Sequence, residues 1–239
     1  MNALELERRA RVWEPPALPT LVIAPHPDDE SLATGGLIAR QSARTAVHVV
    51  AVTDGEASHP GHHPEELARI RIGEQEEALR RLSRGGTAPT VERLALPDGR
   101  VDGHVDELAH HLGRILPRFG VVVAPWVGDH HCDHVAVGRA LARALLELDE
   151  GSPAIRLHPL TVRWSLFWAW HHPPAGFERA PLAGLALTSG EQNHKAAAIA
   201  CHGSQLGDGI GPPVVTPDLL IPVLGCREYY IDQPAVELR

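Results

Sequence analysis

Short apolar runs alternate along the first two thirds of the chain with longer segments of helical periodicity. Residues 20–24 (TLVIA) form an apolar run with prolines on both sides, which is typical of a buried strand that ends at proline. Residues 64–84 place apolar side chains at helical spacing and are followed by two glycines, so they predict a helix. The other predicted strands are 45–53, 91–96 and 121–124, and the other predicted helices are 31–43, 101–116 and 134–148. This alternation predicts an α/β fold, a mostly parallel sheet with helices on both faces.

The pattern changes after residue 151. Residues 156–169 predict one long strand or two short ones, residues 192–201 predict a helix, and the proline-rich stretch 212–222 predicts no element. The sequence contains no internal repeat, low-complexity tract or linker. We therefore expect a single domain over residues 1–239, with a core at about 20–205 and a C-terminal β/α elaboration.

Composition narrows the class of protein. The net charge of −8 over 239 residues argues against nucleic acid as a partner, because phosphate binding requires clustered Lys and Arg. Three cysteines are too few and too widely spaced for a disulfide framework. Residues 1–11 are charged, and no run of about 18 apolar residues occurs, so we expect neither secretion nor a membrane span. A cytoplasmic protein that acts on a small molecule is expected, and a homo-oligomer is left open.

The first polar cluster directly follows the strand predicted at 20–24. His26 and Asp29 are three residues apart, so both side chains face one ion if the chain tightens into the start of a helix. The alternative is that Asp28 or Asp29 only caps the following helix. The combination of a histidine, two aspartates and Glu30 at the carboxyl end of a strand favours a metal site over a cap.

A second cluster, residues 129–134 (DHHCDH), follows another predicted buried strand. His131 and His134 are spaced i and i+3, and His130 and His134 are spaced i and i+4, so either pair shares a face if a helix begins here. Asp133 can orient one of these rings. The alternative is a polar surface loop, which two clusters at the same edge of one sheet make the weaker interpretation.

Together the two clusters supply the ligands expected of a catalytic zinc ion. Two neutral imidazoles and one carboxylate leave a coordination position open for water. Such an ion lowers the pKa of its water toward about 7 and polarises a carbonyl group. We therefore expect a metal-dependent hydrolase, with zinc as the cofactor and Fe(II) as the alternative.

These motifs resemble the PIG-L (LmbE-like) family of zinc-dependent N-acetylglucosaminyl deacetylases. The resemblance rests on residues 24–30 (APHPDDE) and 131–134 (HCDH), which is similar to the family's His-x-Asp-His, and on their order and spacing. Weaker support comes from Ile70-Arg71 with Glu74, from residues 96–99 (LPDG) and from residues 195–205. The resemblance spans about residues 21–205. It implies a Rossmann-like sheet, a GlcNAc-like substrate, and zinc ligands at His26, Asp29 and His134.

The resemblance also implies roles for the remaining polar residues. Asp28 would be the general base, and His131 would be the acid or the group that stabilises the oxyanion. Asp133 would hold the imidazole of His131. Arg71 matches a position that contacts the substrate in relatives. His202 is a candidate for a further substrate contact, and the alternative for it is a surface histidine at a helix end.

Other polar or aromatic residues receive a plainer interpretation. Cys132 is expected to pack as a small apolar residue and not to bind zinc. For residues 59–63 (HPGHH) a solvated loop is favoured over a mobile rim of the pocket. Phe167 and Trp168 are expected to fill the core or an interface and not to stack on a sugar.

The leading hypothesis is therefore a metal-dependent hydrolase that removes the N-acetyl group from a GlcNAc-like amino-sugar conjugate. A second enzyme hypothesis keeps the zinc ion and changes the bond, to an amidase acting on larger acyl groups or thiol conjugates. A third, from another class, is a non-catalytic metal-binding protein that recognises a sugar. The last hypothesis predicts bound metal without amine release.

Overall fold

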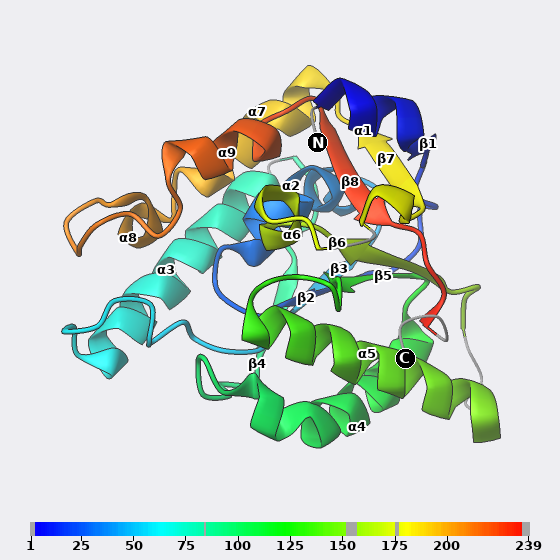
Figure 1. The fold of residues 1–239 in the computed structure, drawn as a ribbon, viewed down its shortest axis with the longest axis horizontal. Coiled ribbons are helices and arrows are strands. Elements are labelled where there is room, and N and C mark those ends of the chain that lie inside the picture. Colours follow the sequence, from blue (N-terminus) through cyan, green and yellow to red (C-terminus); the bar gives the residue numbers. More distant parts are fainter. Residues whose placement is uncertain (1–2, 84, 152–156, 175–176, 236–239) are drawn as a thin grey trace.

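The fold, described by a computed structural model, is built on one sheet (Figure 1). The structure describes residues 3–83, 85–151, 157–174 and 177–235. The strands are β1 (Arg11–Val12), β2 (Thr20–Ala24), β3 (Val47–Ala51), β4 (Thr90–Arg93), β5 (Val121–Pro125), β6 (Thr161–Ser165), β7 (Leu182–Ala186) and β8 (Arg227–Ile231). They form an eight-stranded sheet in the order β1-β7-β8-β6-β5-β2-β3-β4. Strand β8 is antiparallel to both of its neighbours, and the other described pairs are parallel.

Helices cover both faces of this sheet, so the predicted α/β class is confirmed. The helices are α1 (Ala3–Arg9), α2 (Asp29–Ser42), α3 (Pro64–Leu82), α4 (Val105–Ile115), α5 (Cys132–Gly151), α6 (Trp168–His171), α7 (Ser189–Ile199), α8 (Gly203–Leu206) and α9 (Pro217–Val223). Figure 1 shows α4 and α5 together on one side of the sheet, and α2, α3 and α7 on the other. Within the described ranges, no helix combines the length and the apolar character that crossing a membrane requires.

The alternation of side chains along β2 explains the two helical layers. Leu21 and Ile23 belong to the apolar cluster that includes Leu108 of α4, whereas Val22 belongs to the cluster that includes Leu79 of α3. Successive residues of a strand point to opposite faces, so a wholly apolar strand needs cover on both. The central strands β2 and β5 are fully buried and adjacent. Their carboxyl ends therefore bring the two predicted polar clusters together.

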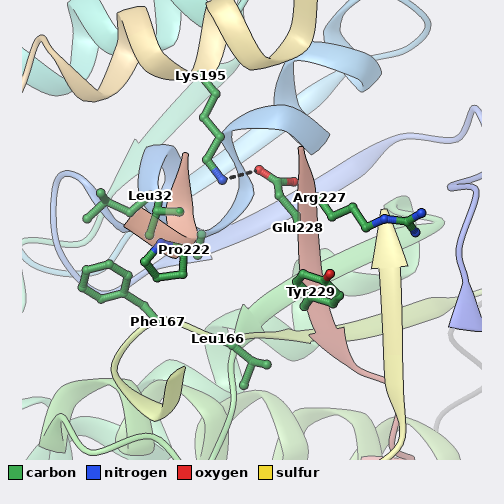
Figure 2. Close-up of a pocket in the computed structure, with 10 residues that line it drawn as sticks. Leu32, Leu166, Phe167, Lys195, Pro222, Arg227, Glu228 and Tyr229 are labelled. Atoms are coloured by element: carbon green, nitrogen blue, oxygen red, sulfur yellow. Dashed lines mark hydrogen bonds and ion pairs between the residues drawn. The ribbon is translucent and has the colours of Figure 1, made fainter. Parts of the chain in front are cut away.

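One buried carboxylate ties the C-terminal strand β8 to helix α2. Glu228 accepts hydrogen bonds from the backbone amides of Gly36 and Leu37 at 2.7 and 2.9 Å and pairs with Lys195 of α7 at 2.8 Å (Figure 2). A Cβ at Gly36 would meet the side chain of Leu187, so a larger residue at this position would force Leu187 to move. The partners on Glu228 offset the cost of burying its charge.

The structure departs from the sequence pattern mainly after residue 151. The segment predicted as one or two strands at 156–169 contains strand β6 and then turns into α6, which begins at Trp168. Strands β7 and β8 and helix α9 were not predicted. Strand β7 is Leu-Ala-Gly-Leu-Ala, without the β-branched and aromatic residues that mark strands. Arg84 and Arg156, at the ends of two predicted elements, lie outside the described residues.

Candidate functional site

The loop after β2 turns sharply into α2 and carries Asp28 on an unusual backbone. Asp28 has φ of 147°, which residues other than glycine rarely adopt and which costs about 1–3 kcal/mol. It occupies the N-cap position, yet among the described residues its carboxylate makes no capping hydrogen bond. The carboxylate lies 3.3 Å from the guanidinium of Arg71. The carboxylate of Asp28 therefore does not cap the helix, and its contact is with Arg71.

Three buried donor atoms converge beside Asp28. Asp29 Oδ2 lies 3.1 Å from His26 Nδ1 and 3.2 Å from His134 Nε2. Two ligands that each lie about 2.0–2.1 Å from a tetrahedral ion are themselves about 3.3 Å apart. His134 Nε2 is buried without a hydrogen-bond partner in the part of the chain that the structure describes. The donors and their spacing therefore fit a divalent cation.

Asp129 fixes the ring of His134 from behind. Its Oδ2 lies 3.0 Å from His134 Nδ1, which leaves Nε2 aimed at Asp29. Burial lowers the pKa of His134, but the charge of Asp29 and the hydrogen bond with Asp129 outweigh burial and raise the pKa to about 9. A cation bound here would replace a proton on this ring.

Two further carboxylates lie beside Nε2, the other ring nitrogen of His26. His26 Nε2 lies 3.2 Å from Asp133 Oδ2 and 3.3 Å from Asp98 Oδ1. Asp133 also accepts hydrogen bonds from the backbone amides of Gly99 and Val101 at 2.7 and 3.1 Å. Burial opposes charge on His26, yet the hydrogen bonds with Asp133, Asp29 and Asp98 raise its pKa well above the ordinary value.

The structure thus places Asp133 differently from what the resemblance implies. Its carboxylate contacts His26, while its contact with His131 is a backbone amide that donates to His131 Nδ1 at 3.3 Å. His131 is half-buried, with its ring centroid 4.7 Å from that of His26. Burial and the positive charges of His26 and His134 lower the pKa of His131. The carboxylate of Asp133 therefore does not hold the imidazole of His131, as the resemblance implies.

Arg71 sets the charge environment of Asp28. Its guanidinium also donates to the carbonyls of Gly55 and Pro27 at 3.0 and 2.9 Å. A Cβ at Gly55 would lie 2.2 Å from the guanidinium, so this close approach requires glycine. Burial raises the pKa of Asp28 to about 7, and the charge of Arg71 opposes that rise.

Two other candidates lie elsewhere. His202 is 2% exposed, and its Nε2 lies 3.1 Å from Ser31 Oγ, so it is neither a surface residue nor one of the described residues that line the cavity below. Burial lowers its pKa to about 3. Cys132 is exposed and not packed as expected, and partial burial and Asp133 raise the pKa of its thiol.

The loop at residues 59–63 is partly folded against the C-terminal segment. His59 is 6% exposed, and its Nε2 lies 3.2 Å from the carbonyl oxygen of Pro212. His62 Nε2 lies 2.5 Å from the carbonyl oxygen of Ile210. His63 is exposed, as a solvated loop predicts. The favoured interpretation thus holds for His63 but not for His59.

A cavity of about 380 Å³ opens beside the converging donors. Its polar lining includes six of the residues described above: His26, Asp28, Asp29, Arg71, Asp98 and His131. Its apolar lining is formed by Leu32, Phe167, Trp168, Val214 and Val215. The volume lies at the lower end of the range for small-molecule sites. The geometry thus provides a cation site, a buried carboxylate and an imidazole around one small-molecule cavity.

Sequence reasoning missed the residues that orient the donors. Asp98 and Asp129 each hold a histidine, although the sequence pattern predicts a role for neither. Asp98 belongs to the Leu-Pro-Asp-Gly stretch, and Asp129 begins the second polar cluster. Both residues therefore lie within sequence motifs that are described above. Among the described residues, the sets whose donor atoms all lie within 4.8 Å of one another are His26 with His131 and His134, and His26 with Asp98 and Asp133. The set of His26, Asp29 and His134 instead rests on the contact of Asp29 with each histidine.

Comparison with known proteins identifies the family. An α/β sheet with a His/Asp cluster at its strand ends defines the general class. Residues 21–145 match the PIG-L family model, described as GlcNAc-PI de-N-acetylase, and this segment is more than half of the chain. The chain therefore belongs to the PIG-L family.

The curated relatives share the motif-bearing part of the chain. The 1D-myo-inositol 2-acetamido-2-deoxy-alpha-D-glucopyranoside deacetylase of Mycolicibacterium smegmatis is 32% identical over 156 residues, which are 54% of each protein. The protein of the same name from Rhodococcus opacus is 29% identical over 178 residues, or 62% of this chain and 60% of that one. The chain spans somewhat more than half the length of the curated relatives it matches.

Solved structures agree on the fold. N,N'-diacetylchitobiose deacetylase from Pyrococcus horikoshii superposes with a TM-score of 0.65 at 22% identity, covering 92% of this chain and 85% of that one. A conserved protein from Thermus thermophilus, TT1542, gives a TM-score of 0.64 at 26% identity, covering 89% and 93%. The zinc-inhibited form of teicoplanin deacetylase Orf2 gives 0.61 at 21% identity, covering 89% and 97%. At these identities the first and third show a common fold.

Proposed function

We propose that this protein is a metal-dependent hydrolase that removes the N-acetyl group from a GlcNAc-like amino-sugar conjugate. The observation that carries the proposal is the contact of Asp29 with both His26 and His134, at a cavity that His26, Asp29 and the buried carboxylate of Asp28 line. Membership of the PIG-L family and the names of the curated relatives support the amide bond of an acetylated sugar as the target.

We assign His26 Nδ1, Asp29 Oδ2 and His134 Nε2 as the ligands of zinc, with Fe(II) as the alternative ion. A bound divalent ion would lower the pKa of a water molecule and polarise the acetyl carbonyl. The set that combines His26 with Asp98 and Asp133 is a poorer choice, because both oxygens of Asp133 already accept backbone hydrogen bonds. Asp129 and Asp133 hold the two ligand rings in position.

In this proposal Asp28 accepts the proton of the attacking water. Its ionised form is required, and both Arg71 and a nearby cation favour that form. The oxygen of the water bonds to the acetyl carbon, the C–N bond breaks, and the amine takes up a proton, so that acetate and a free amino sugar result. His131 lies next to the ligands and supplies a hydrogen bond to the oxyanion or the proton to the leaving amine.

The test is an amine-release assay on N-acetylglucosaminides with and without a chelator. We expect release that stops when metal is removed and returns when zinc or Fe(II) is restored, with the ratio of the two rates deciding the ion. Turnover that survives both Asp28→Ala and complete metal removal would overturn the proposal. Bound metal without any amine release would favour a sugar-recognition protein.

Location is a further part of the proposal. We place the reaction in the cytoplasm, supported by the three free cysteines, Cys132, Cys201 and Cys226, in the described part of the chain. Fractionation of the native cell checks this.

A further inference from the structure

The cavity has an apolar wall that the proposed chemistry does not use. We define this apolar wall as Leu32, Phe167, Trp168, Val214 and Val215. The ring of Trp168 lies 6.4 Å from that of His131 and is tilted by 26° to it. The indole therefore lies next to the position that the proposed mechanism gives to the acetamide group.

Packing against other apolar residues holds the apolar wall in place. Leu32, Phe167 and Val215 are 3–4% exposed and belong to a separate apolar cluster, against which Trp168 packs. The ring of Phe167 meets that of Trp168 edge to face at 5.0 Å. Leu32 and Phe167 also line a neighbouring pocket together with Pro222 of α9 (Figure 2). Trp168 and Val214 are half-buried and keep exposed surface.

The wall offers few groups that could bind hydroxyls. The backbone amides of Val214 and Val215 both donate to the carbonyl oxygen of Gln205, at 3.0 and 2.9 Å. The side-chain amide of Gln205, which also lines the cavity, donates to Ser204 and Ser58. A hydroxyl placed against the side chains of Leu32, Phe167 or the two valines would lose its water without gaining a partner, which costs binding free energy.

The wall also lies mostly outside the segment that defines the family. Residues 21–145 match the family model, whereas Phe167, Trp168, Val214 and Val215 come later in the chain. The family match therefore assigns the polar side of the cavity and leaves the apolar wall without a role. Because substrate specificity commonly comes from parts of a chain outside the shared core of its fold, the wall can indicate the class of substrate.

We propose that the apolar wall binds the aglycone of the substrate, and that this aglycone presents an apolar ring or chain. This inference rests on the proposed deacetylation. Burial of its carbon atoms against Trp168 and Val214 stabilises the complex. The enzyme would thus prefer an apolar N-acetylglucosaminide over one with a polyhydroxylated aglycone, such as the inositol in the names of its curated relatives.

A matched pair of ligands tests this. The cyclohexyl and the myo-inosityl 2-acetamido-2-deoxy-α-D-glucopyranosides differ only in the hydroxyls of the aglycone ring. We expect the cyclohexyl compound to bind about tenfold more tightly, measured by calorimetry on metal-loaded Asp28→Asn protein, in which the substrate stays intact. Equal affinity, tighter binding of the inosityl compound or no binding of either overturns the inference.

Variants of the wall locate the effect. We expect Trp168→Ala to bring the ratio of the two dissociation constants close to one and Trp168→Phe to restore most of it. Val214→Ser, at a half-buried position that tolerates a polar group, should lower the ratio about threefold. Ile221→Ser, 73% exposed and outside the described lining of the cavity, is the matched control and should keep the ratio. An equal loss for both ligands in Trp168→Ala would place the sugar on the indole and overturn the assignment to the aglycone.

Amine release from wild-type protein separates this inference from the proposed function. Release from neither glycoside would overturn the deacetylase proposal, while calorimetry still decides whether the wall prefers an apolar ring. Release from both at equal kcat/KM, with equal dissociation constants, would leave the deacetylase in place and overturn the role of the wall.

Discussion

The two sides of the cavity are built by different physical means. The polar side lies at the carboxyl ends of β2 and β5, and each of its predicted ligand rings is held by a carboxylate behind it. The apolar wall comes largely from residues 167–168 at the start of α6 and from residues 214–215, and shape and packing define it. A hydrogen-bonded frame fixes atoms to fractions of an ångström, as catalysis requires, whereas an apolar wall tolerates changes of side chain.

This contrast predicts where mutations act. Changes on the polar side should abolish metal binding or turnover for every substrate, because the donors act as a unit. Changes in the wall should alter the choice of substrate and leave the chemistry intact.

The largest effect is expected from His134→Ala. The variant loses one of three proposed ligands, so metal content should fall and amine release should drop by about 10³-fold or more. His130→Ala removes an exposed histidine from the same cluster and is the matched control. It is expected to keep its metal content and its rate of amine release. Metal analysis of the purified proteins together with the amine assay checks this. A His134→Ala protein with full metal content would refute the ligand assignment.

Asp133→Asn should weaken metal binding about 10- to 100-fold, because the hydrogen bond that orients His26 is weakened. Competition with a chelator measures the metal dissociation constant. Asp102→Asn, at an exposed position, serves as the control. If Asp133 instead acted on His131, as the resemblance implies, kcat would fall while metal affinity stayed the same.

Asp133 also illustrates what the sequence can and cannot predict. Spacing within the motif left open which ring it orients, and the family resemblance implied His131, but which ring a carboxylate meets depends on side-chain direction. Here the amides of Gly99 and Val101 capture Asp133 and turn it toward His26. Such contacts between residues distant in sequence leave no local signal.

The fold shows the same division. Strand β2 was predicted with its observed boundaries, because an apolar run between prolines is a local signal. Strand β8 carries Glu228, whose partners come from α2 and α7, so its place depends on contacts that the sequence does not display. The apolar wall follows the same rule, since Trp168 was expected in a core or interface and instead lines the cavity.

Arg71→Gln should shift the pH dependence of turnover. Asp28 must be ionised to accept a proton, so kcat/KM falls as the pH drops through its pKa, which burial has raised to about 7 and a bound cation lowers. Removing the positive charge of Arg71 takes away a stabilising charge and should move this acidic limb upward by about one pH unit. The pH profile reports the shift whatever fraction of the variant is folded. An unchanged acidic limb of the pH profile would show that Arg71 does not influence the pKa of the general base.

The smallest effect is expected where the two sides meet. His59, within the family segment, contacts the carbonyl oxygen of Pro212 in the segment that leads to Val214. His59→Ala removes that contact and should lower the free energy of unfolding by about 1 kcal/mol. Because the loosened segment carries part of the apolar wall, KM for the cyclohexyl glycoside should rise two- to threefold, less than the roughly fivefold change that 1 kcal/mol would give if it acted on binding alone. His63→Ala, at an exposed position in the same loop, is the control. Denaturant unfolding and steady-state kinetics measure both quantities, and a fall in kcat without a rise in KM would show that the rim belongs to the polar side.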